Sequence, residues 1–242
     1  MSSHVQARQF DHHKPTRRQP RRVGSALLRG LGVLAVGTTL AVFAAGGVSA
    51  NPGSAPVAGC VAPDMVKPEI KQWDAEPALA IDTGKAYTAK LESTCGTVDI
   101  ALDAARAPRT VNSFVFLAGQ RYFDHTQCHR MTTSGIFILQ CGDPSATGMG
   151  GPGYQFPNEN LDGATYPAGT VAMANAGPDT NGSQFFLVYK DSPLPPSYTP
   201  FGKITGGMDV LEKVANAGVV LGSEDGRPNA DVILNSVTTT QG

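Results

Sequence analysis

Two segments of the chain combine a fixed positive charge and side-chain amides with aromatic residues. The first, residues 129–143, contains Arg130 and Gln140, and the second, residues 173–186, contains Asn175. Arginine is permanently charged and presents a planar fork of donors, and amides both donate and accept hydrogen bonds. The second segment has no obvious nucleophile, so it suits a binding groove better than a hydrolytic centre. Apolar walls for such a groove are available at Phe137, Ile138, Phe186 and Leu194.

Rotation about an X-Pro peptide bond is a reaction that needs only groups of this kind. The amide must lose its resonance, which gives a barrier of about 18–20 kcal/mol, but no bond breaks. A catalyst has to hold the proline ring, grip the flanking backbone and stabilise the twisted amide more than the planar one. Arg130 and Gln140 lie on either side of a turn at residues 132–135, so two antiparallel strands can present both to one groove.

The order of residues in both segments resembles the signature of the cyclophilins, the peptidyl-prolyl cis-trans isomerases, and in particular their membrane-anchored bacterial, actinobacterial members. The similarity extends over about residues 86–237. By motif position it implies that Arg130 is the catalytic cation, with Gln140 and Asn175 beside it. It also implies a substrate-binding surface formed by Phe137, Ile138, Met173, Ala174, Ala176, Gln184, Phe186, Leu194 and Tyr198. The implied activity is non-covalent and uses neither cofactor nor metal.

The chain departs from the best-known eukaryotic cyclophilins at two positions. Where these carry a tryptophan and then a histidine, this chain has Pro193 and Tyr198, while Leu194 keeps its match. A tyrosine can still form a hydrogen bond or pack at a rim. The loss of the indole donor predicts weak or no cyclosporin binding.

Alternating apolar and polar residues predict many short strands and only two helices. A hairpin is expected over 87–102, strands near 129–131, 137–140, 170–174, 185–189, 201–204 and 232–237, and helices over 108–120 and 208–214. This pattern is typical of a mainly β protein. We therefore expect a closed antiparallel eight-stranded cyclophilin-like barrel, capped by two helices.

The residues before the barrel predict an exported, membrane-anchored protein. Residues 1–30 hold seven Lys and Arg and a single acid, and residues 31–50 form an uncharged, largely apolar run. A basic tail before such a run predicts a cytoplasmic N-terminus, a single membrane span and an extracytoplasmic C-terminal domain. Cleavage after Ala50 would release a secreted protein, and a lipobox-like sequence before Cys60 is a third alternative. The Pro- and Ala-rich residues 51–85 predict a stiff linker, on which Trp73 can dock against the isomerase domain, residues 86–242.

Four cysteines in an exported chain permit disulfides. A bridge between Cys60 and Cys95 is favoured, because it would connect the linker to the domain. The alternative is that all four are unpaired and that Cys128 and Cys141 are small buried hydrophobic residues.

The expected partners are proline-containing peptides, unfolded exported proteins and, through the N-terminal segment, the membrane. Nucleic acid is not expected, because the excess basic charge lies in the tail. The main rival hypothesis is a non-catalytic scaffold that binds proline peptides at the cell envelope. A thiol protease built on Cys128 and His129 is disfavoured, because neighbouring strand residues point to opposite faces. A zinc site at His125, Cys128, His129 and Cys141 matches no common ligand spacing.

Overall fold

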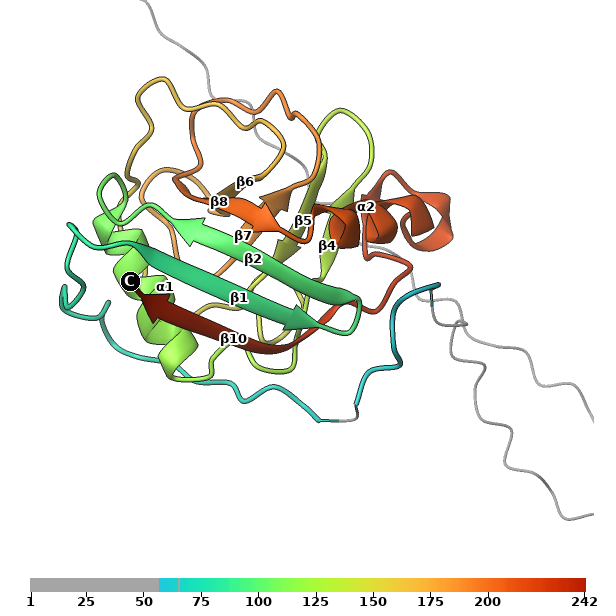
Figure 1. Ribbon diagram of the computed structural model, residues 1–242, viewed down its shortest axis with the longest axis horizontal. Helices are drawn as coiled ribbons and strands as arrows, with labels where there is room; N and C mark the ends of the chain where they lie inside the picture. Colours follow the sequence, from blue (N-terminus) through green and yellow to red (C-terminus); the bar gives the residue numbers. More distant parts are fainter. Residues whose placement is uncertain (1–56, 65) are drawn as a thin grey trace, which may run out of the picture. The chain divides into compact units, whose positions relative to one another are not determined.

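A computed structural model describes residues 57–64 and 66–242 (Figure 1). The predicted basic tail and membrane segment, residues 1–30 and 31–50, lie outside this part of the chain. None of the helices within it has the length and apolar character needed to cross a lipid bilayer.

The fold is a curled antiparallel sheet of ten strands with two α-helices. The sheet order is β3-β10-β1-β2-β8-β6-β7-β5-β4-β9. The strands are β1 (Tyr87–Ser93), β2 (Gly96–Leu102), β3 (Thr126–Gln127), β4 (Arg130–Thr132), β5 (Ile138–Cys141), β6 (Thr170–Met173), β7 (Phe185–Val188), β8 (Pro200–Gly206), β9 (Asp225–Gly226) and β10 (Ile233–Gln241). The helices are α1 (Pro108–Gly119) and α2 (Met208–Ala217), with a short 3₁₀ helix η1 (Val220–Gly222). Figure 1 shows α1 and α2 at opposite ends of the curled sheet.

The prediction of eight strands in a closed ladder is wrong in two respects. The two additional strands, β3 and β9, have two residues each, too few for a period of two to be seen in the sequence. The hydrogen-bonded order of the described residues ends at β3 and β9, and the chain itself passes from β3 to β4 through Cys128 and His129. The strand predicted near residues 129–131 is β4, and the unpredicted β3 precedes it at the end of the hydrogen-bonded order.

Helix α1 covers one end of the sheet with aromatic contacts. Pro108 begins the helix, where its fixed φ is favourable and its missing N–H is not needed. Val111, Phe114 and Leu117 are at most 3% exposed, as their helical spacing predicts. The Phe114 ring lies 5.1 Å from that of Phe123 and 5.5 Å from that of Phe185. The helix thereby fixes the inner face of β7, whose outer face carries predicted site residues.

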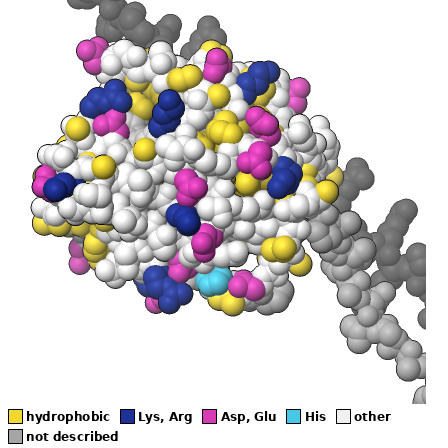
Figure 2. All heavy atoms as spheres, in the orientation of Figure 1, with side chains coloured by type: hydrophobic (Ala, Val, Ile, Leu, Met, Phe, Trp, Pro, Cys, Tyr) yellow, Lys and Arg dark blue, Asp and Glu magenta, His cyan; other side chains and the backbone are white. Residues whose placement is uncertain are grey.

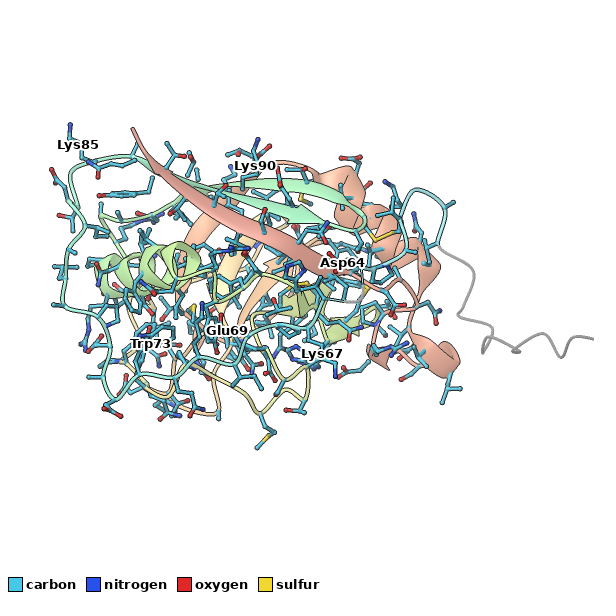
Figure 3. All side chains as sticks on the ribbon, turned by 90° about the horizontal axis from the view of Figure 1, so that it is seen from below. Asp64, Lys67, Glu69, Trp73, Lys85 and Lys90 are labelled. Atoms are coloured by element: carbon cyan, nitrogen blue, oxygen red, sulfur yellow. A yellow bond between two sulfur atoms is a disulfide. The ribbon has the colours of Figure 1, made fainter. Side chains whose placement is uncertain are left out.

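The residues predicted as a linker lie along the domain, and we call residues 57–64 and 66–85 the strap. The Trp73 ring packs at 5.2 Å from Phe116 and 5.9 Å from Tyr122, which confirms the expected docking of Trp73. Figure 3 shows the labelled side chains Asp64, Lys67, Glu69 and Trp73 following one another along the strap.

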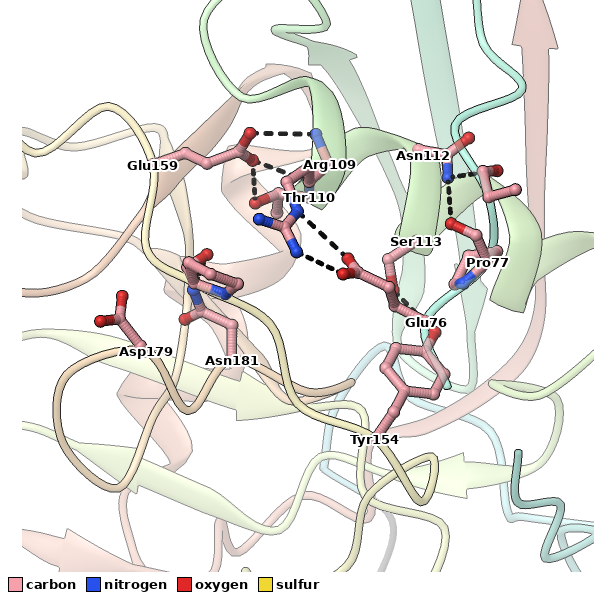
Figure 4. A network of polar contacts seen from close by, with 12 residues as sticks. Glu76, Pro77, Arg109, Thr110, Asn112, Ser113, Tyr154, Glu159, Asp179 and Asn181 are labelled. Atoms are coloured by element: carbon pink, nitrogen blue, oxygen red, sulfur yellow. Dashed lines mark hydrogen bonds and ion pairs between the residues drawn. The ribbon is translucent and has the colours of Figure 1, made fainter. Parts of the chain in front are cut away.

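A polar network holds the C-terminal part of the strap on α1 (Figure 4). The Arg109 guanidinium forms an ion pair with Glu76, and the Asn112 amide donates hydrogen bonds of 3.1 Å to the carbonyls of Pro77 and Ala78. Glu159 accepts hydrogen bonds from the backbone N–H groups at the start of the helix, where they have no intrahelical acceptor.

The four described cysteines form two disulfides. The Cys60–Cys95 bridge is confirmed, and it links the strap to the β1–β2 hairpin. The alternative with Cys128 and Cys141 unpaired is wrong, because these two are joined across the β3–β4 passage and β5. No thiol of Cys128 is then left for a protease or a zinc site.

Removing the strap disulfide should lower stability. The bridge closes a loop with a sequence separation of 35 residues, so the loss of chain constraint should reduce the free energy of unfolding by about 2–4 kcal/mol in a Cys60→Ala, Cys95→Ala double variant. Denaturant unfolding of the wild type and the variant measures this difference. An unchanged unfolding midpoint would mean that the bridge does not constrain the chain.

Candidate active site

The outer face of β4, β5, β6 and β7 carries most of the predicted site residues. Pairing places Arg130 opposite Gln140, Gln140 opposite Phe186, and Ala172 opposite Phe186. Because strand side chains alternate, the residues between them, such as Leu139 and Phe185, point into the main core. The register therefore brings a cation, an amide and an aromatic ring together on one surface.

A continuous chain of hydrogen bonds crosses this surface. Arg130 Nη1 donates to Gln140 Oε1 at 3.2 Å, and Gln140 Nε2 donates to Gln184 Oε1 at 2.8 Å. Gln184 Nε2 in turn donates to the carbonyls of Gly148 and Gly150 at 3.0 and 2.9 Å. Since the arginine only donates, it determines the orientation of both amides.

Asp225 holds the Arg130 end of this chain of hydrogen bonds. Its carboxylate accepts hydrogen bonds of 2.7 Å from Nε and Nη2 of Arg130 in a two-pronged ion pair. These bonds raise the pKa of Arg130 and lower the pKa of Asp225. The Arg130 side chain is 38% exposed, so the fixed cation remains accessible to a ligand. Asp225 was not predicted as a site residue, because no local motif connects it with Arg130, 95 residues earlier.

Asp143 holds the other end, underneath the loop formed by residues 144–153. Its buried carboxylate accepts hydrogen bonds from the N–H groups of Ser145, Gly148 and Gly150 at 2.7–3.1 Å. Burial alone would raise the pKa of Asp143, but the hydrogen bonds from the Ser145 hydroxyl and these N–H groups hold it below its ordinary value. The carboxylate thus fixes the Gly148 and Gly150 carbonyls, which accept the hydrogen bonds from Gln184 Nε2.

An apolar floor lies beside Arg130. Ile138 and Phe186 form a cluster with Leu194, Tyr198 and Ala174, separate from the main core. The Phe186 and Tyr198 rings meet edge to face at 5.6 Å. Tyr198 is backed by Tyr166, whose hydroxyl donates to the Tyr198 carbonyl at 2.7 Å. This surface offers an apolar support for a small ring.

Two predicted binding residues lie away from the floor. Met173, the last residue of β6, points to the main core and is 3% exposed, because it alternates with its neighbours Ala172 and Ala174. Phe137 packs against Tyr189 at 5.9 Å, and the Lys190 ammonium lies 4.5 Å from the centre of its ring. The motif identifies both residues, but a motif position does not show which way a side chain points.

Asn175 and Ala176 form the border between the floor and a neighbouring pocket. The Asn175 amide donates to the Ser197 carbonyl at 2.8 Å, and its Oδ1 accepts from the Gly177 N–H at 3.3 Å. The Ala176 N–H is bound to the Thr180 hydroxyl. Within the described residues the backbone N–H and C=O of Asn175 form no hydrogen bond, so they can pair with an extended peptide.

The neighbouring pocket has a volume of about 610 Å³ and we call it the amide pocket. It shares Gln140, Ala174, Asn175, Ala176 and Gln184 with the predicted site. Its wall is completed by residues 148–155, by Thr180, Gly182 and Ser183, and by Gln72 of the strap. Of the predicted site, Arg130 and the apolar floor lie on one side of Gln140 and the amide pocket lies on the other.

Comparisons with known proteins point to one family. The family profile described as cyclophilin type peptidyl-prolyl cis-trans isomerase/CLD matches residues 88–239. A probable peptidyl-prolyl cis-trans isomerase B of Mycobacterium leprae (strain TN) is 47% identical over 183 residues, covering 67% of this chain and 62% of the relative. A protein with the same description from Mycobacterium tuberculosis (strain ATCC 25618 / H37Rv) is 51% identical over 156 residues, covering 59% and 51%. The chain thus spans less than two thirds of the length of these curated relatives.

Solved structures give the same result for the fold. A cyclophilin type peptidyl-prolyl cis-trans isomerase of Cryptosporidium parvum matches with a TM-score of 0.58 and 28% identity, over 65% of this chain and 99% of that protein. A second structure of that protein was determined in the presence of the dipeptide Ala-Pro, with the same TM-score of 0.58.

Replacing Asp143 should destabilise the loop that it holds. Asp143→Ala leaves N–H groups without their acceptor, so the free energy of unfolding at pH 7 should fall by about 1–3 kcal/mol. The folded-state pKa is lowered, so this contribution is present above the ordinary aspartate pKa of about 3.9 and is lost as the pH falls through the folded value. Unfolding of both proteins at pH 7 and pH 3 measures it. A difference that does not shrink at pH 3 would contradict the role of the charge.

Proposed function

The chain belongs to the cyclophilin-type peptidyl-prolyl cis-trans isomerase family, and we propose that its domain accelerates rotation about X-Pro bonds in exported proteins. The observation that carries the proposal is the Arg130 cation, held by hydrogen bonds beside an apolar floor. Proline-containing peptides are the proposed ligands, and the structure of the Cryptosporidium parvum relative determined in the presence of Ala-Pro supports this class.

In the proposed mechanism the proline ring packs on Ile138, Phe186 and Leu194, and the flanking backbone pairs with the free backbone groups of Asn175. Rotation removes amide resonance and leaves a lone pair on the prolyl nitrogen. A free N–H of the Arg130 guanidinium donates to this nitrogen, an interaction that is stronger for the twisted amide than for the planar one. Every 1.36 kcal/mol gained in this way increases the rate tenfold. No covalent intermediate forms.

The fixed position of Arg130 contributes to this preference. Asp225 and Gln140 occupy three of its five N–H donors, so the guanidinium does not have to be ordered when the amide twists. Donors that are already oriented stabilise a developing charge without reorganisation during the reaction. The same carboxylate weakens the field of the cation, because it balances the charge at short range.

We further propose that the domain acts outside the cytoplasm, attached through residues 31–50 or secreted after cleavage following Ala50. Two disulfides support an oxidising compartment. The pairing of Cys60 with Cys95 disfavours lipidation of Cys60, because the modification and the disulfide need the same sulfur. Interspersed acidic and basic side chains on the face in Figure 2 give no uniform basic surface for nucleic acid on that face.

Weak or no cyclosporin binding remains part of the proposal. Pro193 has no indole N–H and is exposed, and its neighbour Leu194 packs on the apolar floor. Tyr198 uses its backbone N–H and C=O in hydrogen bonds with Tyr166, so the hydroxyl is the group that it can offer to a ligand.

Arg130→Ala should abolish most of the isomerase activity. The loss of a donor that acts on the twisted amide should reduce kcat/KM by about a hundredfold or more, with little change in stability. Exchange NMR with Ala-Pro peptides and the full-length protein measures the rate. Arg121→Ala is the matched control, because Arg121 forms a similar ion pair with Asp124 just after the C-terminal end of α1. Full turnover in the Arg130 variant would contradict the catalytic role of Arg130. A folded wild type without turnover would support the scaffold alternative.

Asp225→Ala should have a smaller effect of a different kind. The guanidinium loses two of its oriented hydrogen bonds but keeps its charge and its bond to Gln140, so we expect a three- to tenfold fall in kcat, about 1 kcal/mol, with KM nearly unchanged. Asp231→Ala, which removes the partner of Arg227, is the control. An effect as large as that of Arg130→Ala would assign Asp225 a direct part in the reaction.

A further inference from the structure

The strap touches the wall of the amide pocket. The Trp73 N–H donates to the Pro152 carbonyl at 2.8 Å, and residues 148–155 form one part of that wall. Gly153 has a φ of +91°, and a Cβ on it would lie 2.6 Å from the Trp73 carbonyl oxygen and 3.1 Å from the Gln72 Cβ. Strap and loop can approach this closely only because residue 153 is glycine.

Anchors on both sides fix the position of Gln72. Before it, the Lys71 ammonium donates to the Gln120 carbonyl at 2.7 Å. After it, Trp73 packs against Phe116 and Tyr122. Gln72 is therefore presented by an ordered backbone, so its side chain can select a ligand without the cost of ordering a mobile loop.

The Gln72 side chain is available for a ligand. It is exposed and lines the amide pocket, and its amide forms no hydrogen bond within the described part of the chain. The family match begins at residue 88, so Gln72 lies outside the domain that the cyclophilin profile describes. Part of the pocket wall, the Gln72 side chain, thus comes from a segment that precedes the family domain.

The polar side chains around the pocket are all uncharged, and they lie beside the apolar Met149, Pro152, Ala174 and Ala176. They include five amides and three hydroxyls, namely those of Gln72, Gln140, Gln155, Asn175, Gln184, Tyr154, Thr180 and Ser183. No acidic, basic or histidine side chain is among the lining residues. A charged ligand side chain would lose water there without gaining an opposite charge. An apolar one would take water from the Gln72 and Gln155 amides, which form no hydrogen bond within the described residues, without replacing it.

We propose that Gln72 is a specificity-determining residue, and that the strap makes the enzyme select clients with an uncharged polar side chain, such as Gln or Asn, close to the proline. The inference rests on the proposed function, because the ligand of the pocket is the peptide held at the Arg130 site. Gln140 and Gln184 connect the two regions, since they line the pocket and also lie in the hydrogen-bonded chain from Arg130.

The test compares peptides that differ in one side chain. Full-length protein is assayed by exchange NMR with Ala-Pro peptides in which Gln, Glu, Lys or Leu stands at each position within two residues of the proline. At the position that enters the pocket, the wild type should have the highest kcat/KM for Gln. Gln72→Ala should reduce the preference for Gln over Leu about three- to tenfold, the effect of one neutral hydrogen bond. Gln72→Glu should shift the preference towards Lys.

Gln120→Ala is the matched control, since it changes another exposed glutamine, whose side chain lies outside the pocket. It should leave all ratios unchanged. Wild-type preferences that survive both substitutions at Gln72 in an active enzyme would overturn the inference and leave the isomerase function intact.

A wild type that binds the Gln peptide without accelerating isomerisation would contradict only the proposed function. In that case the inference is tested by the NMR resonances of the Gln72 side-chain amide, followed while the peptide binds. A shift on binding of the Gln peptide but not of the Leu peptide supports the inference, and the absence of a shift overturns it.

Discussion

The candidate site depends on one chain of hydrogen bonds that is fixed by a carboxylate at each end. Asp225 holds the Arg130 guanidinium, which donates to Gln140, and Gln140 donates to Gln184. Gln184 donates to backbone carbonyls of the loop that Asp143 holds. Because arginine can only donate, the direction of every bond along the chain is determined by its charge. The outer face of the sheet therefore presents a fixed cation on one side of Gln140 and a set of oriented amides on the other.

The strap extends this arrangement beyond the curled sheet. It is connected to the hairpin by the Cys60 disulfide, to α1 by Trp73 and Glu76, and to the wall of the pocket by the contact with Pro152. A segment rich in proline loses little conformational entropy when it becomes ordered, so a few contacts are enough to hold it in place. The residues that precede the domain thus take part in the site as well as connecting it to the N-terminal segment.

The sequence predicts those features that depend on local pattern. Alternation along strands and the order of the motifs indicate Arg130, Gln140 and Phe186, and the structure brings them together. The pairing with Asp225 depends on a two-residue strand without periodicity, and the docking of the strap depends on contacts between distant segments. The pairing leaves no signal in a single sequence, and of the docking only the Trp73 contact and the Cys60–Cys95 bridge could be predicted. Phe137 shows a further limit, since its type and position fit the floor although its ring packs elsewhere.

The central claim is that the proline ring lies on the apolar floor with its amide next to Arg130. Nuclear Overhauser effects between a peptide with a ¹³C-labelled proline and the full-length protein test it most directly. The account predicts contacts from the ring protons to Ile138, Phe186 and Leu194. Contacts to the Phe137 ring in place of these three, or to the surface around Gly163 on another part of the domain, would contradict it.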